Sequence, residues 1–236
     1  MTTRTLPDAV ASVALLAEPM RQRLYDFVTR HGPVGRDAAA QALGISRVLA
    51  AFHLDKLVEG GLLTASFRRL TGRTGPGAGR PAKLYRRSDH EIAVSLPARR
   101  YDRPADAFAT GLERLAQTVG SQAVTEAVNE PARQLGRETG AAVRRAAGAR
   151  GVRRTREALV RQLADDGFEP AVDAHSGAMT LGNCPYLSLS DSHRVLTCGM
   201  NMAWAEGVVD GVRSAGLQPR LDPQPGRCCV VFTPEA

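Results

Sequence analysis

Residues 35–63, GRDAAAQALGISRVLAAFHLDKLVEGGLL, decide the fold of the N-terminal part of the chain. Asp37 can cap a short helix that ends near Leu43, because its side-chain oxygen can accept a hydrogen bond from the first turn. Gly44 then supplies a tight turn, since glycine adopts backbone conformations that other residues resist. Two short helices joined by such a turn are typical of a helix-turn-helix, which this stretch therefore predicts.

The second helix of the pair is expected to begin after a capping Ser46 and to continue to about Glu59, where two glycines stop it. Its apolar positions, at helical spacing, are Leu49, Phe52, Leu57 and Val58. Its exposed side is expected to carry Arg47, His53 and Lys56. These side chains, with Ser46, form a plausible set for contacting base edges and phosphates in a major groove.

A basic hairpin is predicted directly after this helix. Leu62 to Phe67 has a strand pattern, RRLTGRTGPGAGR (residues 68–80) is a glycine- and arginine-rich loop, and Ala82 to Arg86 has the pattern of a returning strand. A strand, basic loop and strand in this position predict a wing, whose cations would pair with phosphates. The predicted wing contacts are Arg68, Arg69, Arg73, Arg80 and Lys83. The alternative is a solvated hairpin loop without a ligand.

The distribution of charge agrees with a nucleic-acid partner for the N-terminal part. Residues 1–100 hold 16 Lys and Arg against 8 Asp and Glu, a net charge of +8, whereas residues 101–236 hold 15 against 16, a net charge of −1. This asymmetry suggests that one part meets a polyanion while the other has a separate task. An ordinary basic surface is the alternative explanation.

Composition places the chain among globular proteins. Of its 236 residues 43% are hydrophobic and only 5% are aromatic, so Leu, Val and Ala must fill most of the core. No apolar run approaches the roughly 20 residues that span a bilayer. Residues 1–8 also lack the pattern of a signal peptide. We therefore expect a cytoplasmic protein, in which four cysteines are more often thiols or metal ligands than disulfides.

Three regions follow from the hydrophobic patterns, and together they predict an α+β chain. Residues 1–100 are expected to form a winged helix-turn-helix domain, residues 101–166 a helical dimerisation region and residues 167–236 an α+β sensor domain. Apolar stripes at helical spacing in the middle region indicate core or dimer packing. A homodimer is expected, because helix-turn-helix proteins commonly pair to match two half-sites on double-stranded DNA.

All four cysteines fall within the last fifty-three residues, at Cys184, Cys198, Cys228 and Cys229. Each lies beside a turn residue, and thiolates at loop edges can converge on one point. Iron–sulfur clusters are held by such thiolates, and zinc would accept the same set. If the adjacent pair lies on a strand, its side chains point to opposite faces, and only one serves the site. Scattered core cysteines are the alternative.

His193 lies between the first two cysteines and could be a further ligand or a hydrogen-bond partner of a sulfur. A histidine at the surface or at a helix cap is the more frequent case. The sequence therefore leaves the role of His193 open.

Two sets of motifs carry a resemblance to known regulators. The stretches ALGISRVLAAFHLDKLVEGGLL and GRPAKLYRRS resemble ArsR-like winged-helix regulators over roughly residues 6–90. The whole chain is similar to the SufR-type iron–sulfur repressors of bacteria, through LGNCPY, LTCGMNMAWAEGVVDG and LDPQPGRCCV. This resemblance implies a homodimeric repressor that binds an iron–sulfur cluster in its C-terminal domain.

Carried over to this chain, the resemblance implies cluster ligands at Cys184, Cys198 and one of Cys228 and Cys229, with Cys228 preferred. It does not settle a fourth ligand, for which His193, the other member of the pair, a carboxylate or a small exogenous ligand are candidates. It leaves open both [2Fe–2S] and [4Fe–4S] clusters.

Three competing interpretations arise at the level of sequence, and one of them, an architectural protein that binds DNA without sequence specificity, is disfavoured by the compact recognition helix. The same C-terminal domain could sense zinc, thiol oxidation or an organic ligand. An enzyme with an appended DNA-binding domain is disfavoured, because the sequence contains no GxxxxGK[ST] phosphate loop and no GxSxG nucleophile motif. We therefore expect no enzymatic activity.

Overall fold

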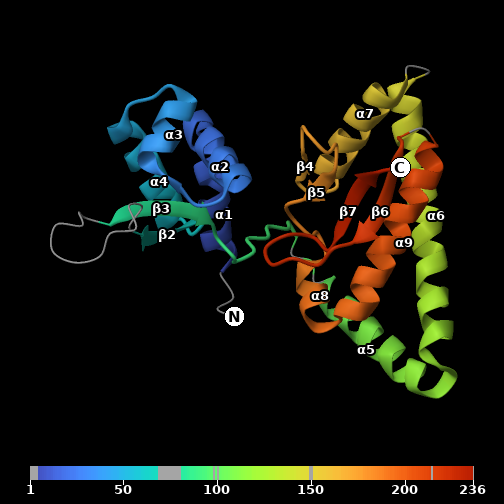
Figure 1. Cartoon of the computed structure of the whole chain (residues 1–236). Helices are drawn as coiled ribbons and strands as arrows, with labels where there is room; N and C mark the ends of the chain where they lie inside the picture. Colours follow the sequence, from blue (N-terminus) through green and yellow to red (C-terminus); the bar gives the residue numbers. More distant parts are fainter. Residues whose placement is uncertain are drawn as a thin grey trace. The chain divides into compact units, whose positions relative to one another are not determined.

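The structure is a computed structural model that describes residues 5–68, 81–97, 99, 101–148, 151–213 and 215–235. It is a mixed α+β fold, as predicted, and divides into an N-terminal unit, Met1–Arg99, and a C-terminal unit, Arg100–Ala236. The described strands form two antiparallel sheets, one in each unit (Figure 1). No helix within the described ranges is long and apolar enough to cross a membrane.

The N-terminal unit packs its helices against a small sheet. The helices are α1 (Leu6–Ala14), the 3₁₀ helix η1 (Leu15–Ala17), α2 (Pro19–His31), α3 (Arg36–Leu43) and α4 (Arg47–Glu59). The strands, in the sheet order β1-β3-β2, are β1 (Val34–Gly35), β3 (Ala82–Arg87) and β2 (Leu63–Arg68). Leu24 and Val28 of α2, Leu54 and Leu57 of α4 and Tyr85 of β3 are buried in one core.

Local signals fix the connection between α3 and α4. Gly44 ends α3 in the left-handed conformation, with φ of 67°, and the hydroxyl of Ser46 accepts the backbone N–H of Leu49 at 3.2 Å. The predicted turn and the predicted cap at Ser46 are therefore confirmed. The predicted cap at Asp37 is wrong, because Gly35 occupies the cap position and Asp37 lies in the first turn of α3.

The C-terminal unit combines long helices with a second sheet. Its helices are α5 (Asp102–Val119), α6 (Ser121–Ala147), α7 (Gly151–Asp165), α8 (Leu187–Ser192) and α9 (Arg194–Val212). Its strands, in the sheet order β4-β5-β7-β6, are β4 (Pro170–Val172), β5 (Met179–Leu181), β7 (Val230–Pro234) and β6 (Leu217–Leu221). Its core joins Val143 and Leu159, from residues 101–166, to Phe168 and Phe232 in the C-terminal stretch.

Helices α6 and α9 run alongside each other at unusually close range (Figure 1). Gly136 and Gly140 of α6 face the backbone of α9, and Gly207 and Gly211 of α9 face the backbone of α6, with no room for a Cβ atom at any of the four. This contact makes α9, which carries one of the cysteines, a closely packed part of the unit.

Candidate functional site

The first candidate site is the N-terminal end of α4, where two predicted DNA contacts lie. The Ser46 hydroxyl is engaged in capping the helix. The Arg47 Nε atom lies 2.6 Å from Asp37 Oδ1, and both side chains are more than half exposed. Because an exposed ion pair of this kind is weak, the guanidinium of Arg47 can exchange Asp37 for a phosphate.

His53 does not lie on the exposed side of α4, so that expectation is wrong. Its side chain is only 13% exposed, and its Nδ1 lies 3.5 Å from Glu18 Oε2 at the start of α2. Helix α2 packs against α4 and covers this face. His53 therefore lies between the two helices and is not available to a base edge.

The other predicted cations of this region have partners within the unit. Lys56 Nζ donates to Glu59 Oε2 at 2.7 Å. Lys83 Nζ of β3 donates to Asp55 Oδ1 at 2.7 Å, and the buried Tyr85 hydroxyl donates to the same oxygen at 2.8 Å. Lys83 therefore links β3 to α4, a structural role that the sequence did not reveal.

The predicted wing is described only at its edges. Arg68 is exposed at the end of β2, which pairs with β3 in register from Leu63↔Arg87 to Arg68↔Ala82. The two predicted strands are therefore confirmed. Arg69, Arg73 and Arg80 lie outside the described residues.

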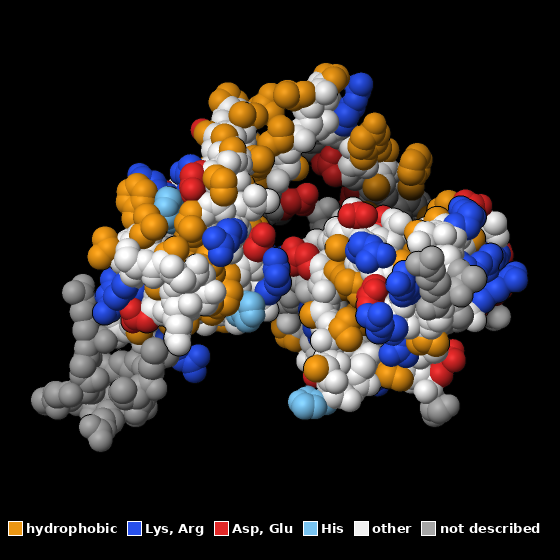
Figure 2. All heavy atoms as spheres, turned by 90° about the horizontal axis from the view of Figure 1, so that it is seen from above, with side chains coloured by type: hydrophobic (Ala, Val, Ile, Leu, Met, Phe, Trp, Pro, Cys, Tyr) orange, Lys and Arg blue, Asp and Glu red, His pale blue; other side chains and the backbone are white. Residues whose placement is uncertain are grey.

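The exposed face of α4 is apolar, although spacing assigns Phe52 to the side opposite the exposed one. Val48 is 80% exposed and Phe52, one turn later, is 57% exposed. We call these two residues the apolar strip. On the face drawn in Figure 2, hydrophobic side chains lie among Lys and Arg side chains. The signal was present, because Val48 and Phe52 are four residues apart, but spacing alone did not show which side of α4 is covered.

The second candidate site is formed by the four cysteines of the C-terminal unit, which we call the thiol cluster. All four are free thiols, with Cys228 buried and the others partly buried. Cys184 is a hydrogen-bonding neighbour of Cys228, which also neighbours Cys229, and Cys229 neighbours Cys198. Sequence positions as far apart as 184 and 229 are therefore brought together.

Backbone and side-chain contacts hold these sulfurs in place. The N–H of Cys228 donates to the carbonyl of Leu181 at 2.9 Å, which anchors the segment before β7 to the end of β5. Asn201 Nδ2 of α9 donates to Cys228 Sγ at 3.3 Å. The Asn201 Oδ1 atom is buried and has no hydrogen-bond partner within the described residues. The side chain that donates to the thiol cluster therefore also carries a buried oxygen without a hydrogen-bond donor in the described part of the chain.

Mutual hydrogen bonding separates the acidities of the thiols. Donation by Cys184, and then by Cys229, holds the pKa of Cys228 well below its usual range. The same contacts with Cys228, together with burial, raise the pKa of Cys184 and of Cys229. Cys228 is thus the thiol that Cys184, Cys229 and the Asn201 amide all neighbour.

Two expectations about the cysteines need correction. Cys198 was expected beside a turn, but it lies inside α9, where Gly199 continues the helix. The adjacent pair precedes β7, which begins at Val230, so the alternating geometry of a strand does not separate the two side chains. Cys229 neighbours both Cys228 and Cys198, so both members of the adjacent pair belong to the thiol cluster.

The thiol cluster offers four sulfur donors, a ligand type that iron–sulfur clusters and zinc both accept. No three His, Cys, Asp or Glu side chains in the described ranges are placed to hold one metal ion together. An iron–sulfur cluster distributes its thiolate ligands over several iron atoms, so it does not require them to meet at one point. Cys184, Cys198 and Cys228 would hold such a group, and Cys229 is the remaining thiol of the cluster.

His193, which the sequence left open as a further ligand, has both of its ring nitrogens facing carboxylates of α5. Its Nδ1 lies 2.9 Å from Glu113 Oε1 and its Nε2 lies 3.1 Å from Asp106 Oδ1. The Glu113 carboxylate, and then that of Asp106, raise the pKa of this buried imidazole. His193 therefore connects the start of α9 to α5, and both of its ring nitrogens are already engaged and are not free to bind a cluster.

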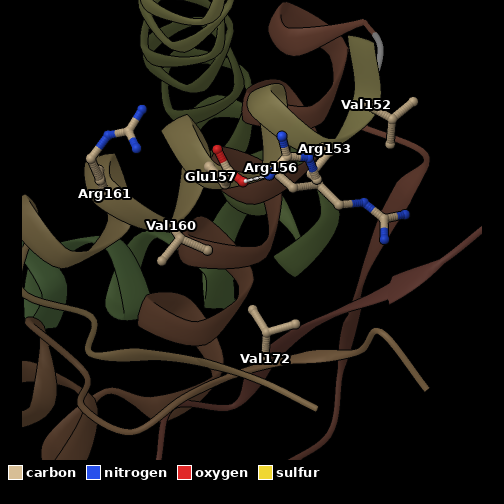
Figure 3. A pocket seen from close by; sticks show the side chains of 7 residues that line it. All are labelled: Val152, Arg153, Arg156, Glu157, Val160, Arg161 and Val172. Atoms are coloured by element: carbon tan, nitrogen blue, oxygen red, sulfur yellow. Dashed lines mark hydrogen bonds and ion pairs between the residues drawn. The ribbon is translucent and has the colours of Figure 1, made fainter. Parts of the chain in front are cut away.

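A shallow hollow of about 670 Å³ lies between α7 and β4, away from the predicted site residues (Figure 3). It is lined by Val152, Arg153, Arg156, Glu157, Val160, Arg161 and Val172. Arg156 donates to the carbonyls of Ala215 and Gly216, and Arg153 pairs with Glu157. Two of its three arginines are thus already engaged, and we assign this hollow no ligand.

Comparison of the chain with protein-family models, with curated proteins and with solved structures gave no match.

Proposed function

We propose that the chain is a DNA-binding transcriptional repressor whose operator affinity is controlled by an iron–sulfur cluster held in its C-terminal unit. In this proposal α3, α4, β2 and β3 are a winged helix-turn-helix, and α4 is the recognition helix. The observation that carries it is the order of these elements within a segment of net charge +8, in which one face of α4 is exposed.

The thiol cluster supports the regulatory half of the proposal. Cys184, Cys198 and Cys228 would bind the group through their sulfur atoms, with Asn201 donating to Cys228. Bound there, the group would supply a centre that oxidants or iron shortage can dismantle. Cys198 is part of α9, whose backbone is in contact with that of α6. Because close-packed helices transmit displacement, a shift at Cys198 would reach α6.

Such control needs only a modest coupling energy. An allosteric coupling of about 1–3 kcal/mol changes affinity roughly 5- to 150-fold. We propose that the helices of residues 101–166 help to join two copies, so that their shift alters the spacing of two recognition helices. Two half-sites in adjacent major grooves are roughly 34 Å apart.

DNA binding is tested with random-sequence duplexes at several salt concentrations. Arg47→Ala should weaken binding, and Arg73→Ala and Arg80→Ala should each lower the salt slope by about one phosphate contact. Arg153→Ala, which removes an exposed arginine of the C-terminal unit, is the matched control and should change neither quantity. Unchanged salt slopes in both wing variants would contradict the proposed wing.

Cluster binding is tested by anaerobic reconstitution, with iron and sulfide counts and a visible spectrum. Cys184→Ser and Cys198→Ser should lose the cluster, whereas Val195→Ala, at an exposed position of α9, should keep it. Wild-type protein that remains colourless and free of iron would overturn the cluster assignment. DNA binding that then still responded to thiol oxidation or zinc would support the alternative sensor.

A further inference from the structure

The exposed face of α4 is apolar, although its neighbourhood is cationic. Val48 and Phe52 follow one another by one helical turn, and Arg47 and Lys56 stand at either end of this strip. Single exposed apolar side chains need no explanation. Here, however, α4 carries three of them, the strongly exposed Val48 and Phe52 and the less exposed Leu49, and it is the helix that the proposed function places against DNA.

Two polar side chains of α4, at positions 53 and 55, are engaged by other elements. His53 is turned towards Glu18, whereas Lys56 lies in an exposed and therefore exchangeable pair with Glu59. Asp55 is occupied by Lys83 and Tyr85. A groove-bound α4 therefore presents Val48 and Phe52 to the base edges, with Arg47 beside them.

We propose that Val48 and Phe52 read thymine through its C5-methyl group in the major groove. This inference rests on the proposed function. The thymine methyl is the apolar feature that a base pair displays in the major groove, and phenylalanine is among the side chains that contact it. The net charge of +8 in the first hundred residues favours a phosphate polyanion over an apolar protein surface as the occupant of this face.

The geometry of the helix also predicts the spacing of the thymines. Residues four apart on a helix are separated by about 6 Å along its axis. Successive base pairs are about 3.4 Å apart along the duplex. Because a helix in the major groove is inclined to the duplex axis, Val48 and Phe52 span at most about two base-pair steps, and preferred sites should carry thymines within that distance of each other.

The experiment removes only the methyl groups. Duplexes selected by the full-length protein from a random library are resynthesised with deoxyuridine in place of each thymidine of the preferred site. Burial of one methyl-sized group is worth about 0.8 kcal/mol, so each contacted methyl should change the Kd about fourfold. Val48→Ala and Phe52→Ala should each reduce this thymidine-to-deoxyuridine ratio towards one. Val10→Ala, a matched exposed valine in α1, should leave the ratio unchanged.

The outcomes separate the inference from the function on which it rests. Failure to select any duplex above random sequence would overturn the proposed function. Equal affinity of the wild-type protein for thymidine and deoxyuridine sites would overturn the thymine inference alone, as would variants that keep the wild-type ratio. A change in self-association in Val48→Ala and Phe52→Ala, with an unchanged ratio, would assign the face to a second copy instead. Because both side chains are exposed, circular dichroism should show folded variants.

Discussion

Gly136 of α6 lies directly against the carbonyl oxygen of Trp204 in α9, and no space remains between them for a side chain. Trp204, the only tryptophan of the chain, also stacks on Phe168, with ring centroids 5.2 Å apart. The glycine therefore sets the distance between two helices, and the tryptophan provides a spectroscopic probe of their packing.

Gly136→Ala should destabilise the C-terminal unit by about 1–3 kcal/mol or more, because the added methyl group forces α6 and α9 apart. Urea unfolding followed by Trp204 fluorescence measures this effect. Gly111→Ala is the matched control, since that helical glycine has open space around it and alanine there should stabilise by up to about 1 kcal/mol. Equal effects of the two substitutions would contradict the close helix contact.

Tyr85→Phe should destabilise the N-terminal unit by about 1.5–3 kcal/mol, because the buried hydroxyl donates to the carboxylate of Asp55. Urea unfolding followed by circular dichroism is the measurement. Tyr101→Phe, at an exposed position, is the control and should have almost no effect. If both variants unfold like the wild-type protein, the Tyr85–Asp55 hydrogen bond does not contribute to stability.

The contact of Asp55 with Lys83 and Tyr85 also predicts that the N-terminal unit loses stability in acid. Burial by itself would raise the pKa of Asp55, but the hydrogen bonds from Lys83 and Tyr85 outweigh it and lower that pKa. The stabilising contribution is therefore present above the unfolded-state pKa, about 3.9, and is lost as the pH falls through the lower folded-state value. In Asp55→Asn the loss of stability below about pH 4 should be smaller than in the wild-type protein.

The stability that His193 contributes is expected to depend on pH in the opposite direction. The pKa of His193 is raised by Glu113 and Asp106, so the imidazolium is favoured in the folded unit. Its stabilising contribution is complete below the unfolded-state pKa, about 6.5, and disappears as the pH rises through the folded-state value. The urea midpoint reported by Trp204 should therefore fall over this interval. A similar fall in His193→Gln would show that another group is responsible, and His175→Gln, at an exposed position, serves as the control.

Asp37→Asn should strengthen DNA binding if Arg47 contacts phosphate, because it releases the guanidinium from its ion pair. Exposed pairs are worth about 0.2–1 kcal/mol, so the Kd should improve roughly 1.4- to fivefold, with little change in folding stability. Asp26→Asn, which breaks the exposed pair with Arg30 on α2, is the matched control. If the two substitutions improve binding equally, the effect is one of net charge and not of Arg47.

Short-range signals in the sequence determined the local structure. Gly44, Ser46 and the two strands that follow α4 were predicted correctly, because turn and capping preferences involve only neighbouring residues. The mixed α+β class was also predictable from the hydrophobic periods. Asp37 shows the limit of such signals. Its side chain is of the capping type, but Gly35 occupies the cap position of α3.

Tertiary structure decided which side chains meet. His53 is covered because α2 packs on α4, and His193 finds carboxylates 87 and 80 residues away, at Asp106 and Glu113. Cys198 joins the other thiols from inside a helix, and Asn201 reaches Cys228 across 27 residues. Periodicity shows which face of a helix is apolar, but only the packing of distant segments determines whether that face is covered, and long-range contacts of this kind leave no local pattern in the sequence.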